Sequence, residues 1–81
     1  MEDYIVMAAM YPTMTSGKVD KFLVKIGDKV APGTAVAEII SEGYFTLLSE
    51  VAGRVKELYV MEGDYVEVDT AIIEVELAED K

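Results

Sequence analysis

Cysteine and histidine are both absent from this sequence. Without cysteine the chain can form no disulfide, no thiolate metal site and no thiol nucleophile, which fits a reducing compartment. Without histidine it lacks the commonest general base and the commonest metal ligand, so its serines have no imidazole to activate them. No Asp-rich stretch has the spacing of a calcium loop. We therefore expect no catalytic residue and no metal ligand, and a chain that is not an enzyme.

Long apolar runs and positive charge are also scarce. The longest apolar run, Ile5 to Tyr11, is far below the roughly 18 residues that a membrane helix needs. No basic leader precedes an apolar segment near Met1, so no signal peptide is expected. Seven basic and 16 acidic residues give a net charge of −9, which repels nucleic acid and anionic membrane surfaces. We expect a cytoplasmic protein with no nucleic acid and no membrane among its partners.

One motif occurs twice in the chain, at a constant offset of 36 residues. Residues Gly17–Val30 of the first copy correspond to Gly53–Val66 of the second, and Thr34–Ile39 correspond to Thr70–Val75. A fixed period of this length indicates one supersecondary unit used twice. Neither copy is long enough to bury a core alone, so both must pack into a single domain that covers residues 1–81.

The apolar pattern predicts strands and no helix. Val19, Phe22 and Val24 are separated by three residues and then by two. The second copy repeats this irregularity, which indicates one extra residue, a β-bulge, in each copy. Strands are expected at residues 2–10, with Ile5 and Met7 facing inward, at 17–24 and its second copy 53–60, and at 35–40, 44–51, around 66 and at 71–75. Residues 77–81 are acidic and are expected to fray or to begin a linker.

Glycine marks the expected turns. Gly27-Asp28 and Gly63-Asp64 each predict a tight turn. Ala31–Thr34 suits a turn with proline at its second position and glycine at its third. The second copy has Val66–Thr70 there, so that turn need not be the same type. About eight short strands joined by such turns are typical of an all-β sandwich or barrel.

Ser41-Glu42-Gly43 lies between the two copies and is short enough for a tight hairpin. Gly43 can adopt a positive φ there. After this hairpin, Phe45, Leu47 and Ser49 are expected to point one way along the strand, and Tyr44, Thr46 and Leu48 the other.

Several turns and strands of this chain resemble the lipoyl and biotinyl carrier domains over about residues 5–76. The segment Pro12–Thr15 is more similar to the lipoyl domains of dihydrolipoyl acyltransferases, the pyruvate dehydrogenase kind especially, than to biotin carriers. The resemblance rests on Pro12–Thr15 followed by Gly17, on Val24–Val30, Gly33, Glu38-Ile39, Val51–Val55 and Glu62–Val66.

The resemblance implies a flattened β-barrel of two four-stranded antiparallel sheets related by a pseudo-twofold axis. In this family a lysine at the tip of the central hairpin carries the cofactor and swings between the active sites of a large complex. Subunits of a 2-oxo acid dehydrogenase complex are the partners that the resemblance implies. The location would be the mitochondrial matrix if the complex is eukaryotic.

The attachment lysine of the family has no counterpart at the hairpin. Counting forward from Gly33 places it on Gly43, and counting back from Gly53 places it on Glu42, so the hairpin region looks one residue shorter than usual. No lysine occurs between Lys29 and Lys56. Neither glutamate nor glycine can form the amide that holds lipoate or biotin, so we expect no cofactor.

Two functions remain open. The first is a lipoyl-type module that is unmodified and acts in protein docking or assembly. The second is an engineered or unmodified variant of a working swinging-arm carrier that transfers acyl groups in a pyruvate dehydrogenase-type complex, and a biotin-carrier-like domain is a remote third reading. The interaction candidates are Ser41, Glu42, Gly43, Tyr44 and Leu48, with Leu23 and Tyr59 as further outward-facing contacts.

Overall fold

The computed structural model describes residues 1–78, and these residues form strands and turns without a helix. No helix in this range could therefore cross a membrane. The eight strands are β1 (Glu2–Val6), β2 (Ser16–Phe22), β3 (Lys29–Val30), β4 (Ala35–Ile40), β5 (Tyr44–Leu48), β6 (Gly53–Leu58), β7 (Tyr65–Glu67) and β8 (Ala71–Leu77).

The strands make two four-stranded sheets in which every pair is antiparallel. The terminal sheet has the order β1-β8-β6-β3, and the hairpin sheet has the order β5-β4-β2-β7. The offset of 36 residues carries β2, β3 and β4 onto β6, β7 and β8. The two orders are therefore the same arrangement built from the two copies of the motif. The all-β fold with two antiparallel sheets and pseudo-twofold symmetry is confirmed.

The core lies between the two sheets and comes from one face of each strand. Ile5, Met7, Leu47 and Ser49 are buried, as the alternation predicts, while Tyr44 and Leu48 are exposed. Both copies also contain the expected β-bulge, because the register shifts between Val19 and Lys21 and again between Val55 and Glu57. The fully buried side chains are Met7, Val19, Val36, Ala37, Ile39, Ile72, Ile73 and Val75.

The turns keep the symmetry of the repeat. Asp28 and Asp64 each donate their backbone N–H to a carbonyl three residues back, at 3.0 Å, after a glycine with positive φ. The turn at Ala31–Thr34 has the same form, with Gly33 at φ 92° and a 2.9 Å bond from Thr34 N to Ala31 O. Its counterpart, Glu67–Thr70, proves to be the same kind of turn, with a 3.1 Å bond from Thr70 N to Glu67 O.

Several boundaries differ from those predicted. β1 ends at Val6 and not at residue 10, although Met7 still exchanges backbone hydrogen bonds with residues 69 and 70. β2 begins at Ser16, one residue before the predicted range 17–24, and ends at Phe22. β5 ends at Leu48 and not at residue 51. Leu77, assigned to a frayed tail, is the last residue of β8, and Ala78 donates a 3.0 Å hydrogen bond to Ala52 O. The rest of that predicted tail, residues 79–81, lies outside the described residues.

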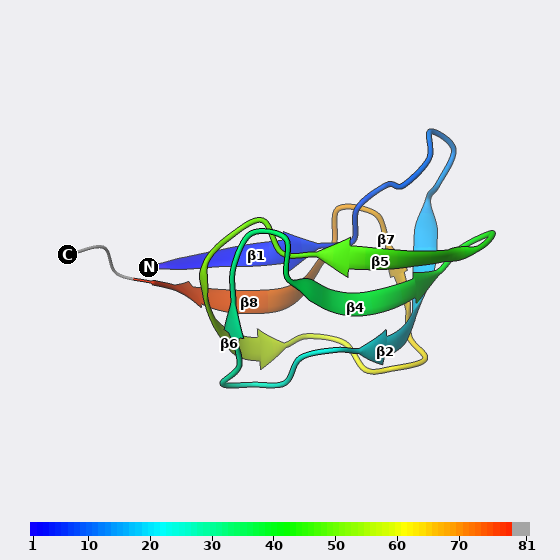
Figure 1. Cartoon of the computed structure of the whole chain (residues 1–81). Coiled ribbons are helices and arrows are strands. Elements are labelled where there is room, and N and C mark those ends of the chain that lie inside the picture. The colour runs from blue at the N-terminus through cyan, green and yellow to red at the C-terminus, as the bar shows by residue number, and fades with distance from the viewer. Residues whose placement is uncertain (79–81) are drawn as a thin grey trace.

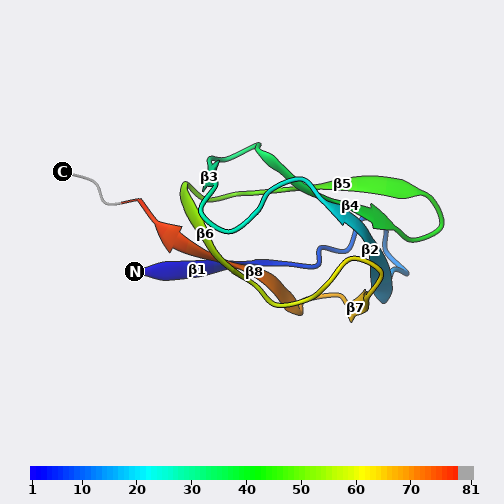
Figure 2. The same cartoon turned by 90° about the horizontal axis from the view of Figure 1, so that it is seen from below.

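The β4–β5 hairpin projects from one end of the molecule, and the first residues of β1 lie at the opposite end (Figure 1). A view at right angles shows the same separation, with β3 and β6 side by side at the end that holds the amino terminus (Figure 2). The midpoint of the sequence is therefore a protruding tip.

Candidate functional site

The hairpin tip is a loop of three residues, Ser41-Glu42-Gly43, closed by the pairing of Ile40 with Tyr44. Glu42 adopts φ 58° and Gly43 adopts φ 151°. The backbone N–H of Ser41 donates to the carbonyl of Gly43 at 2.8 Å. A positive φ is uncommon for a residue with a side chain, so the tight loop imposes the conformation of Glu42.

Side-chain hydrogen bonds hold the base of the tip in place. The Ser41 hydroxyl donates to the carbonyl of Ser16 at 2.9 Å. A serine hydroxyl has one hydrogen, so the 2.8 Å contact between Tyr11 Oη and Ser41 Oγ must have tyrosine as its donor. The Tyr11 ring also packs at 6.0 Å from the ring of Phe45. The tip is thus tied to the start of β2 and to the segment that precedes it.

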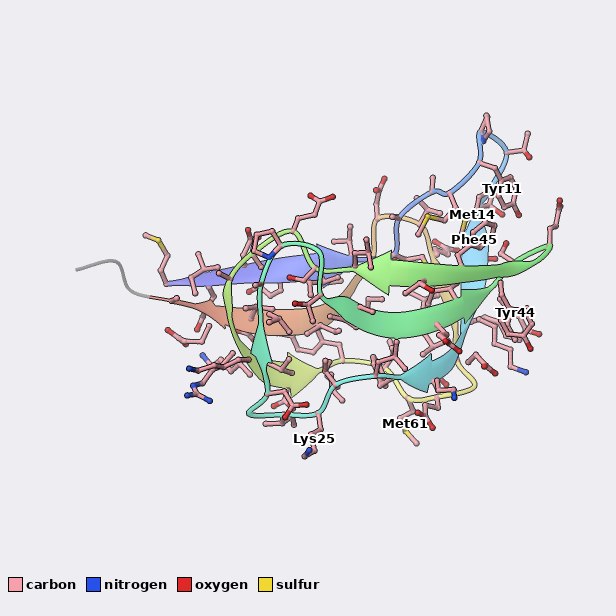
Figure 3. All side chains as sticks on the ribbon, in the orientation of Figure 1. Tyr11, Met14, Lys25, Tyr44, Phe45 and Met61 are labelled. Carbon is pink, nitrogen blue, oxygen red and sulfur yellow. The ribbon has the colours of Figure 1, made fainter. Side chains whose placement is uncertain are left out.

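That preceding segment, residues 7–15, contacts the hairpin through Tyr11 and is itself held in place by Met14. This side chain is 6% exposed, and its sulfur accepts a hydrogen bond from Met10 N at 3.3 Å. The backbone N–H of Met14 donates to Tyr11 O at 3.1 Å, which positions the tyrosine. Tyr11, Met14 and Phe45 lie together near the base of the hairpin in Figure 3. The tip therefore rests on a packed support.

A row of side chains, two of them exposed and two half-buried, crosses the hairpin sheet just behind the tip. In register across all four strands it contains Tyr44, Ile40, Lys18 and Tyr65, which we call the tip row. Tyr44 is 72% exposed and Tyr65 is 77% exposed. The Lys18 Nζ lies 6.0 Å from the centroid of the Tyr65 ring, within the range of a cation–π contact. Exposed tyrosines are typical of a protein-binding surface.

The structure brings four of the five predicted interaction residues together. Ser41, Glu42, Gly43 and Tyr44 form the tip or border it, whereas Leu48 pairs with Ala35 at the other end of β5. Leu23 and Tyr59 are exposed as predicted, but the Tyr59 hydroxyl donates to Glu74 in the terminal sheet. Sequence reasoning missed the tip contacts of Tyr11 and Ser16, and Lys18 and Tyr65 of the tip row. The repeat could have indicated Lys18 and Tyr65, because the offset of 36 residues relates these two positions to Arg54 and Lys29 in the other copy.

The tip does not fit the covalent attachment of lipoate or biotin. That linkage needs the amine of a lysine, and the tip offers a carboxylate at Glu42 and a bare backbone at Gly43. Lys18, the lysine opposite Ile40, belongs to β2 and its amine lies over the Tyr65 ring. Among residues 1–78 no group of three or more acidic side chains is arranged to hold a metal ion. The tip can present an anion and aromatic surface to a partner.

A network of charges occupies the outer face of the terminal sheet. The amine of Lys56 pairs with Glu2, with Glu74 at 3.6 Å and with Glu76 at 3.7 Å. Its hydrogen bond to Glu2 raises the pKa of Lys56 and lowers the pKa of Glu2. The hydrogen bond from Tyr59 to Glu74 raises the pKa of Tyr59 to about 12. These groups join β1, β6 and β8, so they stabilise the sheet and do not contact the tip.

The fold and the protruding hairpin define a small two-sheet β-barrel of the carrier-domain type. The sequence model of the family described as "Biotin-requiring enzyme", the biotinyl and lipoyl family, matches residues 4–75. The chain belongs to this family.

Two curated relatives and one solved structure show the same likeness. The acetyltransferase component 3 of the mitochondrial pyruvate dehydrogenase complex of Arabidopsis thaliana is 36% identical over 67 residues, which cover 69% of this chain. The corresponding acetyltransferase of Rickettsia conorii is 54% identical over 35 residues, which cover 43% of this chain. The matches span 12% and 8% of the lengths of these two relatives.

The lipoyl domain of the 2-oxoglutarate dehydrogenase complex of Azotobacter vinelandii superimposes with a TM-score of 0.69 at 20% identity. The superposition covers 93% of this chain and 99% of that domain. At this identity the likeness establishes a shared fold.

Proposed function

We propose that this chain is a lipoyl-domain-type module that docks onto a protein partner without a covalently bound cofactor. The partner is a subunit of a 2-oxo acid dehydrogenase complex, because both curated relatives are named as components of pyruvate dehydrogenase complexes. The module contributes no catalytic group of its own and acts through binding. The observation that carries this proposal is the tip itself, where Glu42 stands on a supported loop in place of an amine.

The tip row supplies the contact area for docking. Tyrosine side chains bury a large apolar surface at a small cost in conformational entropy, which is why they often dominate binding energy. Tyr44 and Tyr65 flank the row, and Lys18 between them provides a charge. Glu42 at the extremity adds an exposed anion. A partner that presents an apolar surface beside basic side chains would match this arrangement.

The unmodified state is tested by intact mass spectrometry of the natural full-length protein. The protein is expressed with lipoate and a lipoyl ligase, and in a parallel culture with biotin and a biotinyl ligase. We expect the mass of the unmodified polypeptide in both cultures. A lipoyl or biotinyl increment on this segment would refute the proposal.

Docking is tested by titrating the purified subunits of a pyruvate dehydrogenase complex into the protein. Tyr44→Ser should weaken binding by about tenfold, as expected for the loss of an aromatic hot spot. Leu48→Ser is the matched control, because this side chain lies in the same strand and is also exposed but sits away from the tip. Equal effects of the two substitutions, or binding by no subunit, would contradict docking through the tip row.

A second function, that of a swinging-arm carrier whose attachment residue has been replaced, is favoured by one observation. The scaffold around the tip is intact, and position 42 already holds a long side chain at φ 58°. Glu42→Lys, incubated with a lipoyl ligase and lipoate, tests whether the recognition surface survives. Modification would support descent from a working carrier, whereas a folded but unmodified variant would favour a dedicated docking module.

A further inference from the structure

The terminal sheet carries its own row of residues, equivalent by the repeat to the tip row but of different chemistry. In register across the strands this charged row contains Lys29, Arg54, Glu76 and Glu2. The offset of 36 residues relates Lys29 to Tyr65, Arg54 to Lys18 and Glu76 to Ile40. The two copies of one motif have therefore diverged into an aromatic row near the tip and a charged row at the other end.

The two cations of the charged row face each other directly. Lys29 on β3 is the register partner of Arg54 on β6, and like charges directly opposite in an antiparallel pair are destabilising. Neither side chain forms an ion pair within residues 1–78, although the chain contains 16 acidic residues. A carboxylate at one of the two positions would remove this repulsion.

The acidic half of the row is already neutralised. Glu76 is the register partner of Arg54 across β6 and β8, but it pairs with the terminal amine of Met1 at 3.2 Å and with Lys56 at 3.7 Å. Arg54 instead donates from Nη1 to the carbonyl of Gly27 at 3.1 Å. This bond orients the guanidinium and leaves its other N–H groups available, because arginine carries five donors.

The cations border a groove that is otherwise largely apolar. The groove encloses about 710 Å³ between the loop before β3, the strand β6 and the end of β8. Ile26, which is 55% exposed, and the carbon atoms of Val30 and Leu77 contribute its apolar part. An apolar concavity of this size with a few oriented polar groups is typical of a binding site. Figure 2 places β3 and β6 at the end of the molecule away from the hairpin.

We propose that this groove binds an acidic polypeptide segment of a protein partner, with carboxylates on Lys29 and Arg54 and apolar side chains against Ile26 and Leu77. The assignment rests on charge complementarity, since Lys29 and Arg54, which form no ion pair within residues 1–78, both line this groove. It is independent of docking at the tip, because the charged row belongs to the other sheet. A partner could thus be held at one end while the tip remains accessible.

The test uses a capped peptide of about eight residues in which leucine and glutamate alternate, long enough to cross three strands spaced by about 4.8 Å. The peptide is titrated into the protein and followed by amide chemical shifts. We expect changes at residues of β3, β6 and the end of β8, and weaker binding at high salt. A peptide with glutamine in place of glutamate should bind at least about fivefold more weakly, because the charge-assisted bonds are lost.

Two variants separate the groove from net charge. Lys29→Gln with Arg54→Gln should weaken peptide binding at least about tenfold. Lys21→Glu changes the net charge by the same two units at an exposed position of the hairpin sheet that belongs to neither the groove nor the tip row, and it should leave the affinity within about twofold. Both proteins are checked for folding by their amide spectra, since each replaced side chain is on the outer face of its sheet.

Five results would overturn the proposal. Three of them are the absence of peptide binding, equal losses of affinity in the two variants, and shift changes that map to the tip. A dimer in sedimentation that dissociates in the Lys29→Gln, Arg54→Gln variant would also overturn it, because the occupant would then be a second copy of this chain. If free glutamate bound as tightly as the peptide, the ligand of the groove would be a small anion and not a polypeptide, and this result too would overturn the proposal.

Discussion

Tyr11 and Ser41, 30 residues apart in the chain, are joined by a hydrogen bond of 2.8 Å between their side-chain oxygens. The same serine hydroxyl donates onward to Ser16 O, so a relay of two bonds links the loop before β2, the hairpin and β2 itself. Among the described contacts, the Glu42 side chain forms no hydrogen bond. The relay through Ser41 therefore holds the orientation of the tip.

Tyr11→Phe removes one bond of this relay and keeps the ring against Phe45. We expect a loss of about 1 kcal/mol in the free energy of unfolding, the usual value for one hydrogen bond. Amide hydrogen exchange at Ser41 and Gly43 should accelerate more than exchange in β8. Tyr44→Phe is the control, because this ring is 72% exposed. Equal acceleration in both variants would show that the relay does not hold the tip.

Gly17 and Gly53 occupy equivalent positions in the two copies, yet we expect alanine to be far less tolerated at position 53. A Cβ on Gly53 would lie 2.1 Å from the backbone oxygen of Glu76, which is held in the sheet. A Cβ on Gly17 would meet side-chain atoms only, the Cγ2 methyl of Ile39 at 2.6 Å and the flexible end of Met14 at 3.1 Å. Chemical denaturation should show a loss of roughly 1–3 kcal/mol for Gly17→Ala and more than about 3 kcal/mol for Gly53→Ala. A similar, small loss in both would contradict the close approach of β6 and β8.

Asp69 adopts φ 74°, where its counterpart in the first copy is Gly33 at φ 92°. Asp69→Gly should raise the free energy of unfolding by up to about 0.5 kcal/mol, because glycine is not strained at a positive φ. Asp69→Val should lower it by about 1–2 kcal/mol, since a β-branched side chain tolerates this conformation poorly. Gly33→Ala, measured in the same urea titrations, should lower it by about 1 kcal/mol. If Asp69→Val left the free energy of unfolding unchanged, the turn would have relaxed to accommodate the valine.

The Tyr59–Glu74 hydrogen bond predicts a loss of stability at alkaline pH. Tyr59 titrates near 10 in an unfolded chain and has a pKa of about 12 in the folded protein. Its contribution is therefore complete below pH 10 and disappears as the pH rises through 12. Urea unfolding across this range should show the slope, and Tyr59→Phe should reduce it. The slope that remains in the Tyr59→Phe variant comes from Lys56, whose pKa is also raised. An unchanged slope in Tyr59→Phe would rule out the bond.

The ion pair of Lys56 and Glu2 should lose its contribution to stability as the pH falls. The pKa of Glu2 is lowered by its hydrogen bond to Lys56, so its contribution is present above its ordinary pKa of 4.5 and is lost as the pH falls below that value. Lys56→Met should move the midpoint of acid unfolding to higher pH. Lys21→Met, an exposed lysine with no ion pair within residues 1–78, is the control and should leave the midpoint unchanged.

Much of this architecture could be predicted because it follows from local patterns. The spacing of Val19, Phe22 and Val24 indicated a bulge before any pairing was known, and the register shift after Val19 confirms it. The turn at Glu67–Thr70 could not be assigned, because it contains neither proline nor glycine. The positive φ of Asp69 belongs to the short connection that leads from β7 in one sheet to β8 in the other. Leu48 lies at the other end of β5 from the tip, which its outward-facing position in the alternation could not reveal, and its role as a contact residue stays a prediction.

The tip and the charged row both depend on contacts that local sequence patterns do not predict. Spacing and composition were sufficient for the repeat, the hairpin and the lack of a lysine at its tip, since each is a property of neighbouring residues. Which distant side chains meet depends on strand order and register, and these emerge when two sheets bury their apolar faces together. Folding therefore set Tyr11 beside Ser41, Tyr44 in line with Tyr65, and Lys29 opposite Arg54.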